Sequence, residues 1–295
     1  MPLSQKEFNS LQLKIVEAGG RIRELRKQPR DKLVVKEGGK QIVTKMDIES
    51  DDILRTYIQN AFPNDAYVSE ETPDRKKDRI EAKRTWLVDP LDATRWVLQG
   101  LEGAVMVAAI EDHTPVAGVI YNPFKQEMWS AQKGKGTYYT QYVDAGSTLD
   151  LDYGSTKLTA SNRTKLADAF IIISQREFVG QEGMEFAIAM GIHGGVTRQP
   201  SLGLKAGRIA NGTADIYLNW SKDTQEWDVA AADILITEAQ GRSGTLLLKP
   251  MVYCQQESTA LPEGFAIANP YLFEKAIRRF HSLEKPLRKR EDLRL

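Results

Sequence analysis

The sequence predicts a protein of mixed α and β structure, and three observations support that prediction. Apolar residues recur at three- and four-residue steps near the start of the chain, which is typical of an amphipathic helix. Strand-like apolar runs follow between residues 85 and 131. After residue 169, strand and helix patterns alternate, which indicates an α/β layer.

The first helix is defined at both ends. Ser4 and Glu7 form a capping-box pattern, which predicts the start of the helix. Pro29 ends it, because proline has no backbone N–H and clashes with the preceding turn. The apolar face between these ends is interpreted as a packing surface: Phe8, Leu11, Ile15, Ala18, Ile22 and Leu25.

The next elements are short. Two β-like runs flank Gly38-Gly39, so residues 33–44 are predicted to form a hairpin. Asp47 is predicted to cap a helix that continues to Pro63. The mostly charged residues 73–84 are interpreted as a solvated loop or short helix.

The two halves of the chain differ in pattern. Strands in the first half are predicted at residues 85–88, 105–110, 116–121 and 127–131. The irregular, polar run over 134–160 is the predicted boundary, which gives halves of residues 1–150 and 151–295. The second half is predicted to hold strands at 169–174 and 214–219 and helices at 183–190, 201–211 and 228–239.

Composition excludes several classes of function. The 40 Lys and Arg residues balance 40 Asp and Glu residues, so no general nucleic-acid or anionic-membrane surface is expected. One cysteine and three dispersed histidines exclude an internal disulfide and a Cys- or His-rich zinc site. A metal site must therefore use oxygen ligands, which suits Mg²⁺, Mn²⁺ or Ca²⁺. The sequence shows no signal-peptide core or membrane span, so a cytoplasmic location is expected.

The first of four acidic motifs is Asp89-Pro90-Leu91-Asp92-Ala93-Thr94, directly after a buried strand. Two carboxylates and the Leu91 carbonyl give three oxygen ligands in four residues, which suits a hard dication. Thr94 adds a hydroxyl beside them. An Asp-capped turn is the alternative interpretation of this motif.

The other three motifs are weaker by themselves. The adjacent carboxylates of Glu70 and Glu71 repel each other, which a dication would relieve, although such pairs are usually exposed and inert. Asp228 opens an apolar helix, where a carboxylate beside free N–H groups suits a metal and a phosphate, or simply caps the helix. Asp47 is either a helix cap or the partner of a neighbouring hydroxyl.

In combination, the four motifs resemble the signatures of the inositol monophosphatase superfamily, whose members are Mg²⁺-dependent, lithium-sensitive phosphomonoesterases. The resemblance extends from the N-terminal helix past Gly241. It implies an α+β / α/β fold, the layered α-β-α-β-α sandwich of the sugar phosphatases, with the site between the two halves. The matching segments are Ile42-Val43-Thr44-x-x-Asp47, Ser69-Glu70-Glu71, Trp86 to Thr94, and Trp227-Asp228-x-Ala230-Ala231.

The resemblance also implies roles for individual residues. Thr94, paired with Asp47, would orient and activate the attacking water, and Glu71 would support the metal shell. The Gly38-Gly39 tip corresponds to a mobile loop over the site. Two or three Mg²⁺ ions are implied, with Mn²⁺ as a possible substitute and Li⁺ as an inhibitor. Their ligands would be Glu70, Asp89, the Leu91 carbonyl, Asp92 and Asp228.

Ala93 departs from the family pattern, which usually has glycine after the second aspartate. Glycine tolerates backbone angles that alanine disfavours. If this position needs a positive φ, we expect a shifted loop and altered activity.

The second half resembles the branch of CysQ-type 3′(2′),5′-bisphosphate nucleotidases, through Ser201-x-Gly203-x-Lys205 and then Ala214-Asp215-x-Tyr217. This implies 3′-phosphoadenosine 5′-phosphate as the favoured substrate, with Lys205 at its second phosphate. A solvated helix lysine is the alternative, and Ser174-Gln175-Arg176 matches the nucleotidase motif only in part. The predicted substrate contacts are Ala93, Ser174, Arg176, Ser201, Lys205 and Glu226.

Other functions stay open at this point. Inositol monophosphate or fructose 1,6-bisphosphate are alternative substrates of the same chemistry. A catalytically inactive, metal-binding interaction protein is the alternative of another class. The partner is expected to be a small phosphate ester, without nucleic acid or membrane, and a homodimer is possible.

Overall fold

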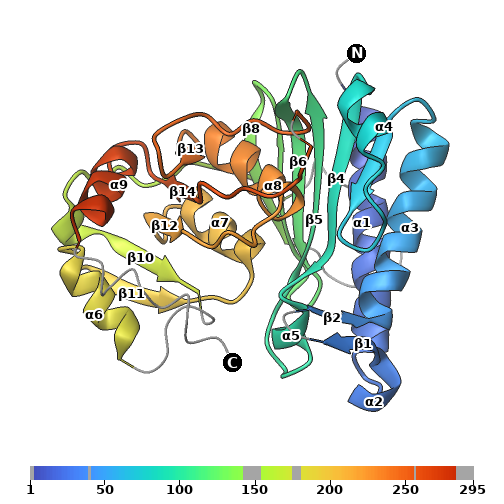
Figure 1. Cartoon of the computed structure of the whole chain (residues 1–295), viewed down its shortest axis with the longest axis horizontal. Helices are drawn as coiled ribbons and strands as arrows, with labels where there is room; N and C mark the ends of the chain where they lie inside the picture. Colours follow the sequence, from blue (N-terminus) through green and yellow to red (C-terminus); the bar gives the residue numbers. More distant parts are fainter. Residues whose placement is uncertain (1–2, 39–40, 142–153, 175–180, 256, 284–295) are drawn as a thin grey trace.

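A seven-stranded sheet forms the centre of the first half of the chain (Figure 1). The computed structural model describes residues 3–38, 41–141, 154–174, 181–255 and 257–283. β3 and β4 pair in parallel, and the other neighbours in this sheet are antiparallel. In spatial order, the strands are β3 (Ala66–Ser69), β4 (Arg84–Asp92), β5 (Ala104–Glu111), β6 (Thr114–Asn122), β7 (Glu127–Gln132), β8 (Gly136–Gln141) and β9 (Thr156–Leu158).

Both faces of this sheet are buried, because successive side chains of a strand point to opposite sides. Trp86 and Val88 of β4 pack with the outer helices α1 (Gln5–Leu25) and α3 (Lys45–Ala61). Leu87, between them, packs instead with the helices of the second half. The capping box predicted at Ser4 and the apolar face predicted for α1 are confirmed.

A smaller, five-stranded sheet forms the second half. β10 pairs in parallel with β11 and β12, and β14 pairs antiparallel with β12 and β13. In spatial order, the strands are β11 (Gly195–Arg198), β10 (Phe170–Ile173), β12 (Ile216–Asn219), β14 (Phe265–Ala268) and β13 (Arg242–Thr245).

Four helices complete the layers. α7 (Leu202–Ala210) and α8 (Glu226–Glu238) lie between the two sheets and share one apolar core with both. α6 (Glu182–Ala189) and α9 (Phe273–Ser282) cover the far face of the smaller sheet. The result is the α-β-α-β-α sandwich that the family resemblance implies (Figure 1).

Short elements connect these layers. The predicted hairpin is present as two antiparallel strands, and its tip at residues 39–40 lies outside the described residues. The short elements are α2 (Arg30–Leu33), β1 (Val34–Gly38), β2 (Gln41–Thr44), α4 (Lys76–Glu81), α5 (Thr94–Val97) and a 3₁₀ turn (Leu166–Asp168).

The division at residue 150 also lies outside the described residues. β9 follows that position and still pairs with β8, so the first sheet continues beyond the predicted boundary. Among the described residues, no helix combines the length and apolar character needed to cross a bilayer.

The prediction of a merely solvated segment at 73–84 is wrong at Arg79. This residue lies in α4 and is 1% exposed. Its guanidinium donates to both oxygens of Asp74 and to the Glu257 carbonyl, and its own carbonyl accepts from the Thr85 hydroxyl. A charged pattern therefore conceals a buried arginine, and the hydrogen bond from Thr85 to its carbonyl joins α4 to β4.

Two predicted helix caps are also shifted by three residues. Thr44, not Asp47, is the N-cap of α3, and Gln225, not Asp228, is the N-cap of α8. Both aspartates occupy the third helical position, where the carboxylate accepts from the backbone N–H of the N-cap residue.

Candidate active site

The site begins where β4 departs from regular pairing with β5. Asp89 lies opposite Met106 and Asp92 opposite Ala104, with an irregularity in the register between them. Asp89 Oδ1 accepts from the Leu91 backbone N–H at 3.0 Å, and the Ser50 hydroxyl donates to the Pro90 carbonyl at 2.9 Å. Irregularities of this kind re-aim side chains at the end of a strand. Here the turn holds two carboxylates at one edge of the sheet.

Three carboxylates converge at this edge. Glu70, Asp89 and Asp228 each offer an oxygen, and these oxygens all lie within 4.8 Å of one another. Glu70 follows β3, the parallel neighbour of β4, so the ends of the two strands meet at the same edge. Asp228 arrives from the first turn of α8. Asp89 is buried, Asp228 is half-buried and Glu70 is exposed, so the cluster opens to solvent on the side of Glu70.

The electrostatics of the cluster favour a cation. Loss of solvent around the carboxyl raises the pKa of Asp228 to about 7, and repulsion from Asp92 adds to the shift. The pKa values of Glu70 and Asp89 lie well above their ordinary range, first through desolvation and then through repulsion from neighbouring carboxylates. Such groups bind either protons or a metal, and an all-oxygen set suits a hard dication. The residues present therefore fit the metal ion that the sequence implies.

Asp92 lies beside this cluster and is anchored by α7. Its Oδ2 accepts from the Ser201 hydroxyl at 2.6 Å and from the Gly203 backbone N–H at 3.0 Å. Burial raises the pKa of Asp92, and these two hydrogen bonds oppose that rise. Gly203 allows α7 to pack closely on β6, because a Cβ at this position would lie 2.8 Å from Ile120 Cγ2. The role of Asp92 as a further metal ligand stays a prediction.

Thr94 and Asp47 form the pair that the sequence predicts. Thr94 Oγ1 lies 2.6 Å from Asp47 Oδ1 and 2.8 Å from the Leu91 carbonyl oxygen. Asp47 is 2% exposed, and its Oδ2 accepts from the Thr44 N–H and hydroxyl. Burial raises the pKa of Asp47, while the hydrogen bonds from both threonines lower it. A hydroxyl is thus held beside the carboxylate cluster with acceptors for its proton.

Glu71 contributes a further carboxyl near this pair. It is half-buried, and its pKa is raised to about 7 by desolvation and by repulsion from Asp47 and Asp51. Its backbone N–H donates to the Ser69 hydroxyl. The predicted supporting role of Glu71 stays a prediction.

Ala93 adopts a backbone conformation that favours glycine. Its φ is +70° and its ψ is +33°, in the left-handed region. The turn has therefore not shifted to avoid this region. Alanine accepts the strain, and α5 starts directly after it.

The predicted substrate contacts are distributed unevenly. Ser201 is buried and bonds Asp92, and Ser174 is buried at the end of β10. Lys205 is 2% exposed, so the alternative of a solvated lysine is wrong. Its Nζ lies 4.3 Å from the centre of the Tyr217 ring and donates to the Pro200 carbonyl. Arg176 lies outside the described residues.

Glu226 takes partners that the sequence does not predict. Its carboxylate is buried and accepts from the Cys254 backbone N–H at 3.0 and 3.1 Å. Burial raises the Glu226 pKa to about 7. The side chain therefore fastens the start of α8 to a loop, and its contact with substrate stays a prediction.

Two positioning contacts were missed by the sequence reasoning, namely Ser50 with Pro90 and Gly203 with Asp92. Nothing in the pattern around Ser50 marks it. The Ser201-x-Gly203 opening of α7 is the signal that points to the second contact.

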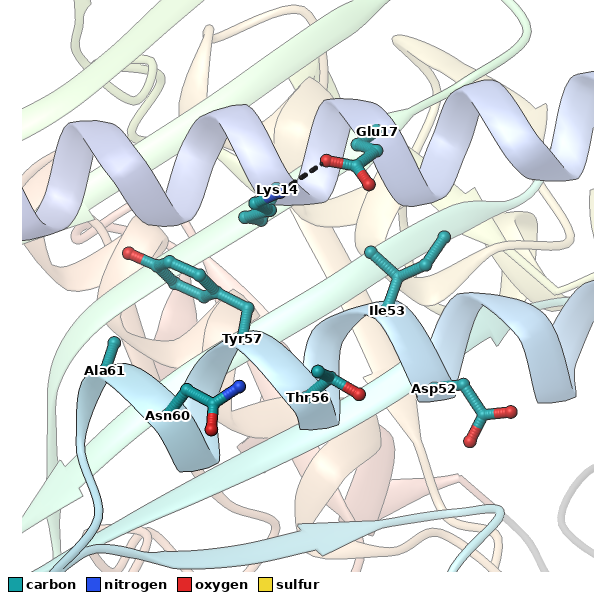
Figure 2. A pocket seen from close by; sticks show the side chains of 8 residues that line it. All are labelled: Lys14, Glu17, Asp52, Ile53, Thr56, Tyr57, Asn60 and Ala61. Carbon is teal, nitrogen blue, oxygen red and sulfur yellow. Dashed lines mark hydrogen bonds and ion pairs between the residues drawn. The ribbon is translucent and has the colours of Figure 1, made fainter.

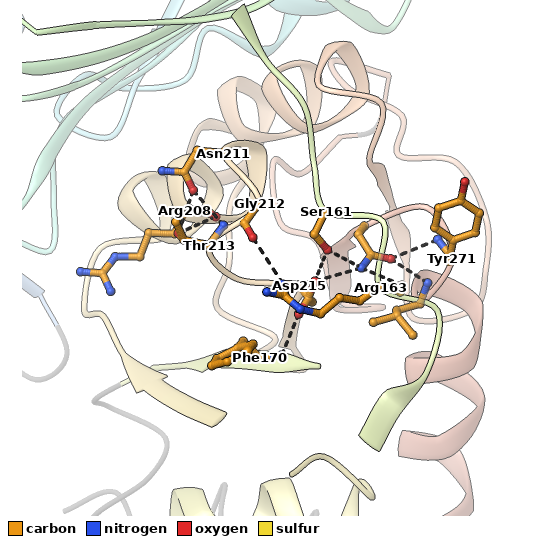
Figure 3. Close-up of polar contacts among 11 residues, drawn as sticks. Ser161, Arg163, Phe170, Arg208, Asn211, Gly212, Thr213, Asp215 and Tyr271 are labelled. Carbon is orange, nitrogen blue, oxygen red and sulfur yellow. Dashed lines mark hydrogen bonds and ion pairs between the residues drawn. The ribbon is translucent and has the colours of Figure 1, made fainter. Parts of the chain in front are cut away.

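Asp215, from the Ala-Asp-x-Tyr segment, has a structural role (Figure 3). It is fully buried and accepts from the Ser161 hydroxyl, the Arg163 guanidinium, the Phe170 N–H and the Asn269 amide. These bonds join the segment before β10 to the ends of β12 and β14, and so fix the smaller sheet.

The volume of a surface hollow does not by itself locate the candidate active site. A hollow of about 650 Å³ lies between α1 and α3, with Tyr57 and Ile53 directed toward α1 and the Lys14–Glu17 ion pair above them (Figure 2). None of the predicted site residues lines it.

Comparison with known proteins agrees with this geometry. The model of the inositol monophosphatase family matches residues 4–284. The chain belongs to this family. It is therefore a phosphatase of the phosphoric monoester hydrolase class, in a metal-dependent family that acts on small phosphate esters.

Relatives of this chain carry the names of two different phosphatases. The 3′(2′),5′-bisphosphate nucleotidase CysQ of Aggregatibacter actinomycetemcomitans is 29% identical over 75% of this chain and 78% of its own length. The inositol-1-monophosphatase of Rhizobium meliloti is 28% identical over 70% and 73%. The extragenic suppressor protein suhB of Bartonella henselae shares the fold, with a TM-score of 0.76 at 21% identity over 93% of this chain and 98% of its own.

Proposed function

We propose that this chain is a Mg²⁺-dependent, lithium-sensitive phosphomonoesterase whose favoured substrate is 3′-phosphoadenosine 5′-phosphate. The observation that carries the proposal is the convergence of the Glu70, Asp89 and Asp228 carboxylates beside the Thr94–Asp47 pair. The site would lie between the two halves of the chain, since Asp228 comes from the second half and the other four residues from the first. The cytoplasmic location and a homodimer stay predictions.

The carboxylate cluster would hold the ions. Glu70, Asp89 and Asp228, with Asp92 and the Leu91 carbonyl as further ligands, supply oxygens only. Bound Mg²⁺ would lower the pKa of water and neutralise charge on the phosphoryl group. Neutralisation would also permit all these carboxyls to stay ionised together at neutral pH.

Thr94 would orient the attacking water. Its hydroxyl proton points to Asp47 Oδ1 or the Leu91 carbonyl, so the oxygen keeps lone pairs for a hydrogen bond from water. As the water oxygen bonds to phosphorus, its proton would pass to Thr94 Oγ1 and the threonine proton to Asp47. The bond from phosphorus to the 3′ oxygen breaks, and that oxygen takes a proton from solvent, which gives phosphate and adenosine 5′-phosphate.

The choice of a bisphosphate substrate rests on the start of α7 and on the CysQ relatives. Lys205 adds a buried positive charge that acts on Asp92, next to Ser201. We propose that this charge strengthens binding of a second phosphate. Inositol monophosphate is the second candidate, because the inositol-1-monophosphatase relative is as similar as the nucleotidase.

One panel of substrates tests both the metal-dependent phosphatase activity and the preference for a bisphosphate nucleotide. Phosphate release is measured on 3′-phosphoadenosine 5′-phosphate, inositol 1-phosphate and fructose 1,6-bisphosphate, with Mg²⁺, with EDTA and with Li⁺. We expect release only with Mg²⁺, inhibition by Li⁺, and loss of release in Asp92→Asn. The bisphosphate nucleotide should give the highest kcat/KM, and Lys205→Met should reduce it more than that of inositol 1-phosphate. Mg²⁺ binding without turnover on any ester would instead support an inactive interaction protein.

A further inference from the structure

A separate polar cavity lies where the first turns of α1 pack on β7 and β8. Its volume is about 320 Å³, within the range of roughly 300–1,000 Å³ that is usual for small-molecule sites. None of the proposed catalytic or metal-binding residues lines it. In Figure 1, α1 begins near the marked N-terminus, whereas α5, which starts at Thr94, lies at the other end of the first sheet.

Two polar side chains in the wall have no hydrogen-bond partner among the residues that the structure describes. Gln12 and Ser130 are each 6% exposed and line the cavity. Within the described part of the chain, neither side chain forms a hydrogen bond with another residue. The polar groups of both side chains are therefore available to water or to a ligand in the cavity.

The rest of the wall is held in place. The Gln132 amide donates to the Leu3 carbonyl at 3.2 Å, and Lys135 Nζ donates to Gln132 Oε1 at 2.8 Å. Phe8, which is 4% exposed, supplies an apolar surface beside these groups. Gln132 and Lys135 are therefore held by contacts of their own, independent of any ligand.

The chemistry of the wall selects the ligand class. The free amide of Gln12 offers two donors and an acceptor, and the Ser130 hydroxyl donates and accepts. No carboxylate is among the lining residues, and their one cation, Lys135, is exposed to solvent and bonded to an amide oxygen. We propose that this cavity binds a small, uncharged, hydroxyl-rich molecule of the polyol class.

Binding of glucose and of myo-inositol to the full chain tests the proposal. Ligand-observed NMR titrations are made in EDTA, so that the carboxylate cluster does not contribute through a metal. We expect saturable binding of at least one polyol, weakened about tenfold in Gln12→Leu and about threefold in Ser130→Ala through lost hydrogen bonds. Gln59→Leu is the matched control, because Gln59 lies exposed on α3 outside this cavity. It and Asp92→Asn should bind as the wild type does.

Several results would overturn the proposal. One is the absence of saturable binding, and another is binding that Asp92→Asn abolishes while Gln12→Leu does not. A crystal grown with the polyol that shows ordered water only in the cavity would also refute it. Tighter binding of glucose 6-phosphate that is lost in Lys135→Met would show an anion site instead. If Gln12→Leu fails to fold by circular dichroism, Ser130→Ala decides the question.

Discussion

Replacement of Ala93 by glycine should stabilise the protein. Ala93 sits at φ +70° between Asp92 and Thr94, the first residue of α5. A residue with a Cβ in this region costs about 1–2 kcal/mol, and glycine removes that cost. Glycine also gives the unfolded chain more freedom, which returns about 0.4–1 kcal/mol. The net gain expected for Ala93→Gly is therefore about 0–1.6 kcal/mol in the free energy of unfolding, with a central value of about 0.8 kcal/mol.

Urea unfolding of the metal-free protein measures this gain without a contribution from bound ions. Ala61→Gly is the matched control, since Ala61 is exposed and ends α3 without a positive φ. There the same exchange should cost up to about 1 kcal/mol, because glycine weakens a helix. The two variants should thus shift the midpoint in opposite directions.

Activity gives a second measurement of the same reasoning. The turn already has the conformation that glycine favours, so Ala93→Gly should leave Thr94 beside Asp47 and keep kcat near the wild-type value. A variant that is no more stable than the wild type, or that loses stability as Ala61→Gly does, would show that the left-handed turn carries no strain.

Three further predictions concern the site. Thr94→Val keeps the shape of the side chain but removes the hydroxyl, so kcat should fall about 10²–10⁴-fold with an unchanged circular dichroism spectrum; a tenfold or smaller loss would contradict the role of Thr94. Ser201→Ala removes the 2.6 Å hydrogen bond to Asp92 and should weaken Mg²⁺ binding, measured by calorimetry, whereas the exposed Ser282→Ala should not. The Asp228 pKa is raised from 3.8 to about 7, so the metal-free fold favours the protonated carboxyl. The contribution of Asp228 to stability in EDTA should therefore be complete below about pH 4 and be lost as pH rises through 7, so the fall in stability over this range should be smaller in Asp228→Asn and in saturating Mg²⁺. A metal-free stability that rises over this range would refute that assignment.

The sequence predicted most of the fold because its signals are local. The Ser4–Glu7 capping box, the apolar face of α1 and the strand runs each depend on neighbouring residues, and the structure has them at the expected places. The pairing of β9 with β8 was not predicted, because it joins two segments that residues 142–155 separate in the chain.

In the candidate site, too, contacts between distant segments were harder to predict than local patterns. The Thr94–Asp47 pair was predicted from the family motifs, and the structure brings the two side chains together. The partners of Lys205 and Glu226 could not be predicted, because Tyr217 and Cys254 lie in other elements of the fold. Burial also changed the interpretation of Arg79, whose charged surroundings in the sequence indicate solvent. Local patterns place a residue on an element, but they do not state what packs against it.

The sequence left open whether Asp47 caps a helix or serves a hydroxyl, and whether Asp228 caps a helix or serves a metal; the geometry of the two residues is alike. Each occupies the third position of its helix, and each uses Oδ2 to accept the backbone N–H of the N-cap residue. A carboxylate has a second oxygen, and in Asp47 that oxygen accepts from Thr94. Asp228 likewise offers a carboxylate oxygen within 4.8 Å of oxygens of Glu70 and Asp89, while its Oδ2 accepts from the Gln225 N–H. Capping therefore fixes the direction of each carboxylate, and the helix start that it stabilises becomes the means by which distant segments bring their charges to one site.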